Sequence, residues 1–267
     1  MSKILIFEGN TRQKCEEQLS DNIKPYYIVF QDVVNHFTNN NEYDVMFPCD
    51  TDYTPLTTET LQQYDYIFIT GSGVSCSASC NDPIADNFKK QMEFIFNSNV
   101  PCYGSCWGMQ VACNYVGLKT GENPNGIEVP LAHNITLTKD GENHPMFNGR
   151  TRQFDAFCIH RDIVFENFSN SEITVLASNK NTTVQAVEIK HNEGIFWGTQ
   201  YHPEILEDRI RYPLKNNLNH YKEVKLFKDN ETVDSIMEKT MANNPDDLKD
   251  YDNHAIEIKN FLNYFKK

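Results

Sequence analysis

Short, continuously apolar runs alternate with longer amphipathic stretches in the first part of the chain. The apolar runs predict buried strands, at 3–7, 43–47, 66–70 and 100–103. The stretches between them predict helices, over 12–37 with a break near Pro25, from Pro83 to about Asn97, and over 107–116 with Gly117 at the end. Strands that are apolar on both faces and alternate with helices are typical of a parallel sheet covered by helices on both sides.

After Gly126 the pattern changes to the alternation of apolar and polar residues that half-buried strands show. Five such runs predict antiparallel strands that extend the sheet, at 127–138, 152–159, 173–177, 184–190 and 194–200. Residues 205–253 are polar with a moderate helical pattern, and 254–266 predict an amphipathic helix that docks on the rest. Because the sequence shows no linker or repeat, we expect one domain over 1–267, in which 205–267 is a mostly helical extension.

Composition and charge exclude several classes of partner. The chain has 267 residues, of which 39% are hydrophobic, which is enough for a substantial core. Its 24 basic and 37 acidic residues give a formal net charge of −13, so we expect neither nucleic acid nor a membrane as partner. No apolar run approaches the ~20 residues of a transmembrane helix. The N-terminus lacks the apolar core of a signal peptide, and a cytoplasmic protein is predicted.

The eight cysteines do not have the spacing of a zinc site. Cys76 and Cys80, like Cys102 and Cys106, stand in C-x3-C pairs where zinc knuckles have C-x2-C, and no paired histidines follow. We therefore expect no metal and no cofactor, and most of the thiols are interpreted as reduced and buried. The histidines of polar stretches, such as His254, are interpreted as solvated.

One cysteine stands in a pattern of its own. The segment Gly104-Ser105-Cys106-Trp107-Gly108 joins a predicted strand to a predicted helix and has the form G-x-C-x-G. A nucleophile on a sharp strand-to-helix turn needs small residues two positions before and after it, which Gly104 and Gly108 supply. The helix N-terminus favours a thiolate and leaves the Trp107 amide free to donate to an oxyanion. Taken alone, the pattern also fits a core cysteine between two turn glycines.

Two further segments place polar groups at strand ends. His202 follows a predicted strand, and Glu204 comes two residues later, where an extended chain points both side chains to the same side. Glu204 would then accept a hydrogen bond from the imidazole and stabilise its charged form. Gly71-Ser72-Gly73 follows another strand and would present backbone N–H groups to a developing negative charge. Alone, each segment also fits an ordinary strand-end histidine or a plain turn.

In this order and in an α/β frame, the three segments resemble the class I, triad-type glutamine amidotransferases, and most of all their stand-alone, GMP-synthase-like members. The two signature blocks are Gly-Ser-Cys-Trp-Gly-Met-Gln around Cys106 and Tyr-His-Pro-Glu around His202. Supporting similarity covers most of the chain, including Phe-Cys-Ile-His-Arg-Asp at 157–162. The resemblance implies a flavodoxin-like three-layer α/β/α fold, with a mostly parallel sheet extended by antiparallel strands.

The resemblance also implies a mechanism. Cys106 attacks the side-chain amide of glutamine, His202 transfers the proton, and Glu204 orients His202. Ammonia leaves, and water hydrolyses the γ-glutamyl thioester to glutamate. The resemblance further implies that the backbone amides of Trp107 and of Gly71 or Gly73 donate to the oxyanion. It also implies that the substrate is held by Gln110, His160 and Asp162.

Three activities fit such a triad. The first is glutaminase activity that delivers ammonia to a separate synthetase. The second is hydrolysis of another γ-glutamyl amide, a γ-glutamyl-amine or γ-glutamyl peptide, and the third is a non-catalytic, glutamine-sensing or regulatory subunit of a synthetase. The sequence contains neither a Walker loop nor the Ser-Gly-Gly-x-Asp-Ser loop of the ATP-pyrophosphatase half of GMP synthase, so any ammonia acceptor is expected on another chain.

Overall fold

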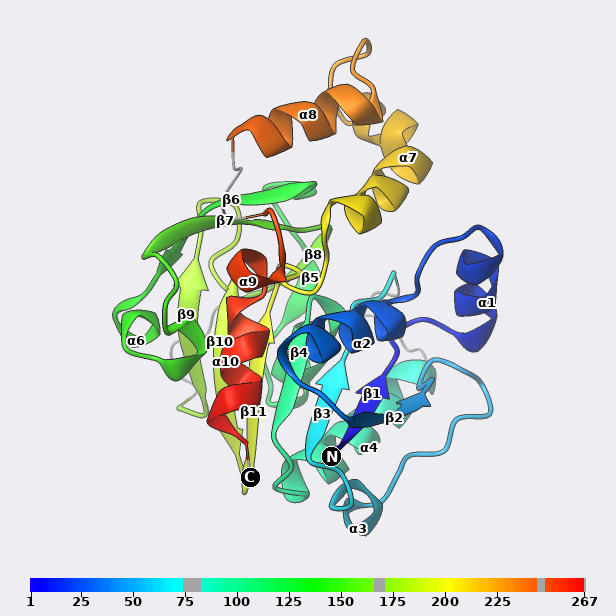
Figure 1. Ribbon diagram of the computed structural model, residues 1–267, viewed down its shortest axis with the longest axis vertical. Helices are drawn as coiled ribbons and strands as arrows, with labels where there is room; N and C mark the ends of the chain where they lie inside the picture. The colour runs from blue at the N-terminus through cyan, green and yellow to red at the C-terminus, as the bar shows by residue number, and fades with distance from the viewer. Residues whose placement is uncertain (74–82, 166–170, 244–247, 267) are drawn as a thin grey trace.

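A mixed sheet forms the centre of the molecule (Figure 1). The structure is a computed structural model and describes residues 1–73, 83–165, 171–243 and 248–266. In this part of the chain the main sheet has nine strands in the order β2-β1-β3-β4-β11-β10-β9-β6-β7. Their bounds are β1 Ser2–Phe7, β2 Asn41–Met46, β3 Tyr66–Ile69, β4 Cys102–Ser105, β6 Leu131–Leu137, β7 Gln153–Phe157, β9 Ile173–Ser178, β10 Ala186–His191 and β11 Gly194–Thr199.

The sheet has a parallel half and an antiparallel half, and β11 belongs to both. Strands β2, β1, β3, β4 and β11 pair in parallel. Strands β11, β10, β9, β6 and β7 pair antiparallel. Because the carboxyl ends of parallel strands meet at one edge, the residues that follow β1, β3, β4 and β11 come together there. Glu8, Gly71, Cys106 and His202 all lie at this edge.

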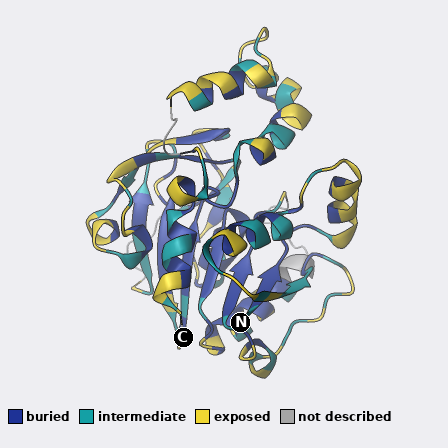
Figure 2. Ribbon diagram, in the orientation of Figure 1, coloured by how far each residue is buried: buried dark blue, intermediate teal, exposed yellow. Residues whose placement is uncertain are grey.

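Helices cover both faces of the sheet, so the molecule has the three layers that the sequence predicts. On one face, α2 Tyr26–Phe37 and α10 Ile256–Tyr264 pack through apolar side chains such as Phe30 and Phe261. On the other, α4 Pro83–Asn97 and α5 Trp107–Tyr115 pack through side chains such as Met92 and Met109. Figure 2 shows the buried strands between helices whose outer faces are exposed.

The remaining helices are short or lie outside these layers. They are α1 Arg12–Ser20, α3 Thr58–Leu61, α6 Lys139–Glu142, the 3-10 helix Pro145–Phe147, α7 Glu207–Glu223, α8 Val233–Asn243 and α9 Tyr251–His254. Helices α7 and α8 extend beyond the β6–β7 edge of the main body (Figure 1) and share an apolar cluster that includes Leu214, Ile236 and Met237. Among the described helices, none combines the length and the apolar character needed to cross a bilayer.

A buried ion pair fixes the C-terminal helices to the sheet. Arg150 and Glu257 have 2% and 0% exposed side chains and lie 3.0 Å apart. Arg150 also donates to the carbonyl oxygens of Asn253 and His254, and the Tyr201 hydroxyl donates to Glu257. Each charge is therefore satisfied by several partners, as buried charges require.

Several predicted elements have other bounds in the structure. Pro25 does break the first helical stretch, since α1 ends at Ser20 and Pro25 is the N-cap of α2. The helix predicted over 254–266 is α10, which begins at Ile256 because the non-helical conformation of Ala255 separates it from α9. A second, two-stranded sheet of β5 Thr120–Glu122 and β8 Asp162–Val164 was not predicted, because three residues show too little alternation.

Glu8, which follows β1, makes the stability of the fold depend on pH. Its carboxylate is fully buried and accepts hydrogen bonds from Asn10 and from the Tyr27 amide, but burial still raises its pKa to about 7. Because the folded pKa lies above the ordinary glutamate value of 4.5, the folded state holds the proton more tightly than the unfolded state. The stability that protonated Glu8 contributes is complete below the unfolded pKa and is lost as the pH rises through 7.

We therefore expect Glu8→Gln to gain stability relative to the parent as the pH rises. A shift of this size corresponds to about 3 kcal/mol of unfolding free energy between pH 4.5 and pH 8. Urea unfolding of both proteins across this pH range measures the difference, and Glu16→Gln, on the exposed side of α1, is the matched control. A difference between Glu8→Gln and the parent that is the same at every pH would contradict the prediction.

Candidate active site

Cys106 occupies a strained turn between β4 and α5. Its backbone angles are φ 51° and ψ −106°, a left-handed conformation that non-glycine residues rarely adopt. The surrounding backbone holds it there, since the Cys106 amide donates to the Thr199 carbonyl over 2.7 Å and its carbonyl accepts from the Gln110 amide. Strain of this kind, maintained by neighbouring strands, is typical of nucleophiles at a strand-to-helix turn.

The two glycines of the motif are required by close packing. A Cβ atom on Gly108 would lie 2.4 Å from the carbonyl oxygen of Ile69, and one on Gly104 would lie 2.8 Å from the backbone of Gly108. Neither contact is possible without moving backbone, so the turn can form only with glycine at both positions. The same closeness brings α5 against β3 and places its N-terminus at the edge of the sheet.

His202 and Glu204 form a buried pair at the same edge. The Nδ1 atom of His202 lies 2.7 Å from Oε1 of Glu204, and the side chains are 1% and 0% exposed. Ser105, the residue before Cys106, donates from Oγ to the same Glu204 oxygen over 2.8 Å. Glu204 therefore connects Ser105, beside Cys106, to His202. Because Glu204 bonds Nδ1, it makes no contact with Nε2 of the ring.

The environment of His202 favours its charged form. Burial lowers the pKa of the imidazole, but the Glu204 carboxylate and the Cys106 side chain outweigh burial and raise the pKa well above its ordinary value. Because Glu204 occupies Nδ1, Nε2 is the ring nitrogen left for another partner. No group among the described residues lies in hydrogen-bond geometry to Nε2 in this state. The arrangement suits an imidazole that carries a proton for transfer.

His202 is positioned by two residues to which the sequence analysis assigned no role. The Tyr26 ring stacks on the imidazole with a centroid distance of 5.5 Å and an interplanar angle of 10°. His254 is fully buried, so the prediction that it is solvated is wrong, and its Nε2 lies 2.9 Å from the His202 carbonyl oxygen. Both come from distant parts of the chain, and their local sequence carries no signal for this role.

The loop after β3 lies against the histidine. A Cβ atom on Gly71 would come within 2.7 Å of Cε1 of His202, so only glycine fits between the two. Gly73 is exposed and has no atom near its Cβ position, and residues 74–82 that follow it, with Cys76 and Cys80, lie outside the described residues. Trp107 is the first residue of α5, where backbone N–H groups have no acceptor within the helix.

Gln110 and Asp162 are in contact, and both belong to the wall beside Cys106. The side-chain amide of Gln110 donates to the Asp162 carbonyl over 2.8 Å and to Gln200 over 3.2 Å. The Cys106 sulfur lies 3.8 Å from the carbonyl oxygen of Ile159, in the same segment. The Gln110 side chain thus connects the start of β8 to the first turn of α5 by a hydrogen bond.

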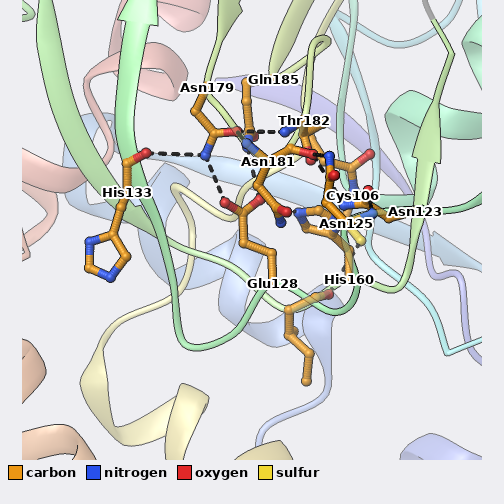
Figure 3. A network of polar contacts seen from close by, with 12 residues as sticks. Cys106, Asn123, Asn125, Glu128, His133, His160, Asn179, Asn181, Thr182 and Gln185 are labelled. Atoms are coloured by element: carbon orange, nitrogen blue, oxygen red, sulfur yellow. Dashed lines mark hydrogen bonds and ion pairs between the residues drawn. The ribbon is translucent and has the colours of Figure 1, made fainter. Parts of the chain in front are cut away.

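The His160 side chain points into a buried polar network around Glu128 (Figure 3). Glu128 accepts from His160 over 2.9 Å, from Gln185 over 3.0 Å and from Asn179 over 2.7 Å. Burial raises the pKa of Glu128, but these hydrogen bonds and the His160 charge outweigh it, and the pKa lies below its ordinary value. Sequence reasoning missed Glu128, because its three partners lie 32, 51 and 57 positions away in the sequence.

The same network contains the one group of possible metal ligands found among the described residues. Ligand atoms of Glu128, Cys158 and His160 lie within 4.8 Å of one another. The Glu128 carboxylate is already bonded to His160 and to two amides, which explains the arrangement without a metal. The six described cysteines, including Cys158, are buried and carry free thiols.

A comparison with protein families decides the identity of the fold. The sequence model of the class-I glutamine amidotransferases matches residues 26–221. The chain belongs to this family. Within the class-I glutamine amidotransferases, the matched region contains the whole parallel half of the sheet except β1, together with Cys106, His202 and Glu204. The family resemblance and the α/β/α fold expected from the sequence are thereby confirmed.

Individual relatives and solved structures agree with the family. Over 182 residues the chain is 37% identical to a γ-glutamyl-L-1-hydroxyisopropylamide hydrolase of a Pseudomonas species, which is 66% of this chain and 58% of that protein. It is 30% identical over 145 residues to a glutamine-hydrolysing GMP synthase of Shewanella loihica, 52% of this chain and 26% of that protein. The chain therefore spans well under two thirds of the length of these relatives.

A crystal structure of a glutamine amidotransferase from Thermotoga maritima has a TM-score of 0.63 with this chain at 12% identity. The alignment covers 99% of this chain and 97% of the other. At this identity the likeness concerns the fold, and it includes the C-terminal part that the family model does not match.

Proposed function

We propose that the chain is a cysteine-dependent hydrolase of γ-glutamyl amide bonds. One observation carries the proposal: the thiol stands on a strained turn at the sheet edge where a buried carboxylate holds an imidazole and raises its pKa. A cysteine, a histidine and an orienting acid in this arrangement are the groups that acyl transfer through a thioester requires. Family membership supports the same reaction class.

In this proposal, Cys106 is the nucleophile. Its sulfur forms a bond to the amide carbon, the carbon–nitrogen bond breaks, and His202 gives its proton to the nitrogen that leaves as ammonia or an amine. Water then attacks the γ-glutamyl thioester, His202 takes a proton from it, and the carbon–sulfur bond breaks to give glutamate and the free thiolate. Glu204 holds the imidazole in one tautomer and stabilises its charge through both steps.

The remaining residues receive roles in binding. The backbone amides of Trp107 and of Gly71 or Gly73 would donate to the oxyanion, a role supported by the α5 N-terminus and by the loop at His202. Gln110 and Asp162 would hold the glutamyl part of the substrate, since they form the wall beside Cys106. His160 would support that wall from behind, through Glu128.

The relatives favour two substrates of this one bond type. The similarity to a γ-glutamyl-L-1-hydroxyisopropylamide hydrolase favours the amide of an amine. The similarity to glutamine-hydrolysing GMP synthases favours glutamine, with ammonia delivered to a separate synthetase. We propose a γ-glutamyl amide other than glutamine as the principal substrate, because that relative matches more of the chain at higher identity.

Turnover of two matched substrates tests the proposal. The purified chain is expected to release ethylamine from γ-glutamylethylamide and ammonia from L-glutamine, with glutamate as the common product, and the first substrate is expected to have the higher kcat/KM. Mass spectrometry of the rapidly quenched reaction should show a γ-glutamyl group on the peptide that contains Cys106.

Two results would overturn the proposal. Absence of glutamate and of the acyl-enzyme, with and without cell extract, excludes hydrolysis. Thermal stabilisation by glutamine in the absence of any turnover would instead support a glutamine-sensing subunit. Turnover of glutamine that appears only with extract would indicate a partner synthetase.

A further inference from the structure

Arg209 is a buried cation with no anionic partner. It lies in the first turn of α7, is 7% exposed, and its Nε atom is buried without an acceptor. Across the described parts of the chain it makes no ion pair and no hydrogen bond, and its partners are the rings of Tyr26 and Tyr212, with centroids 4.5 and 5.7 Å from the guanidinium carbon. An unpaired buried charge is expensive, so a fold retains one only where something compensates it.

The rest of the chain shows how unusual this is. Acidic residues outnumber basic ones by 37 to 24, so carboxylates are plentiful. The other deeply buried arginine, Arg150, is bound by Glu257 and two backbone carbonyls. On α7 itself, Glu207 is paired with Arg211, and the Asp208 side chain is exposed. Neither is the counter-ion of Arg209.

Glu8 does not neutralise Arg209 either. The Glu8 carboxylate accepts hydrogen bonds from Asn10 and Tyr27, and no ion pair joins it to the guanidinium. The Arg209 charge acts to lower the pKa of Glu8, but burial outweighs it. A guanidinium in direct contact with the carboxylate would have the opposite result.

Arg209 is close to the group that protonates the leaving nitrogen. Its guanidinium carbon lies 4.5 Å from the centre of the Tyr26 ring, and that ring stacks on His202 at 5.5 Å. The guanidinium is therefore no further from the imidazole than the sum of these distances. Because His202 gives its proton to the departing nitrogen, the amine part of a substrate must begin at His202. A dipeptide attached there spans about 7 Å when extended, enough to bring its carboxylate towards Arg209.

We propose that Arg209 binds a carboxylate on the amine side of the substrate, so that γ-glutamyl peptides with a free C-terminal carboxylate are preferred to γ-glutamyl amides of neutral amines. The inference rests on the proposed function and specifies its substrate. The planar guanidinium matches a carboxylate with two parallel hydrogen bonds.

A pair of nearly isosteric peptides tests this inference. γ-Glutamyl-alanylglycine carries the carboxylate, and its C-terminal amide does not. For the wild-type chain, kcat/KM is expected to be about 10- to 100-fold higher for the acid, the scale of a charge-assisted hydrogen-bonded pair. Arg209→Met should bring the ratio of the two values close to one. Arg211→Met, on the same helix and paired with Glu207 and Asp234, is the matched control and should retain the wild-type ratio.

Two results would overturn the inference. One is a wild-type chain that cleaves acid and amide equally well. The other is an Arg209→Met variant that is slower on both substrates by the same factor, because Arg209 would then only support Tyr26 and His202. If Arg209→Met does not fold, Arg209→Lys replaces it, and a ratio that falls but stays above one is expected, because lysine keeps the charge without the fork.

Binding separates this inference from the proposed function. If neither peptide nor glutamine is hydrolysed, the proposed function fails, and calorimetric titration of a Cys106→Ala variant still compares the affinities of acid and amide. Tighter binding of the acid that Arg209→Met removes supports the carboxylate site. Equal affinities overturn it.

Discussion

Cys106→Ala is expected to lower kcat for γ-glutamyl amide hydrolysis by about 10⁴-fold or more, the scale of losing a nucleophile from a triad. None of the other described thiols is expected to replace it, because none of them lies on a positive-φ turn. The loss should appear in kcat and leave substrate affinity nearly unchanged, since the sulfur contributes to bond formation more than to binding. Steady-state release of glutamate measures it.

A second cysteine on the same strand provides the control. Cys102 is the first residue of β4, at the opposite end of the strand from Cys106, and it is buried in the core. Cys102→Ala is expected to keep kcat within about threefold of the parent, because it removes one small buried group. Mass spectrometry after reaction with a glutamine-like electrophile should show the label on the parent and on Cys102→Ala. Cys106→Ala should carry no label. Retention of activity in Cys106→Ala would remove the basis of the mechanism.

Glu204→Gln is expected to reduce kcat by about 10²- to 10⁴-fold, as loss of an orienting carboxylate does in triads of this kind. The carboxylate raises the pKa of His202, so its neutral replacement lowers that pKa. The imidazolium then loses its proton at lower pH. The alkaline fall of kcat/KM should therefore move to lower pH in the variant.

A pH series of kcat/KM measures the movement. Glu207→Gln is the matched control, because that carboxylate lies three residues later on α7 and is paired with Arg211 at the surface. It should keep the parent's profile. A Glu204→Gln variant with an unchanged alkaline limb would show that the carboxylate does not act through the imidazole.

The local motifs predicted the parallel half of the fold and the residues at its edge. Gly104 and Gly108 flank Cys106, and this spacing predicts a tight strand-to-helix turn from the sequence, because such a turn has no room for a Cβ atom at either position. Strands such as β1, β3 and β4 are continuously apolar because both faces are covered, and this too is visible in the sequence. The bounds of α4 agree with prediction because Pro83 suits the first turn of a helix.

Contacts between distant segments could not be predicted in this way. Tyr26 and His254 contact His202, and Arg209 contacts Tyr26, but the local sequence of each residue indicates only a helix. Glu128 begins an apolar run, where a single acid suggests an exposed position, but three side chains from other segments bury and satisfy it. The polar composition of 205–253 likewise concealed the apolar cluster that joins α7 and α8.

The bond from His254 to the His202 carbonyl has a consequence for synthesis. The two residues are 52 positions apart, and translation reaches the later one last. A nascent chain thus contains Cys106, His202 and Glu204 before His254, which bonds to the His202 carbonyl, has been added. Under the proposed function, His202 is therefore expected to reach its final position only after the segment that contains His254 has been synthesised.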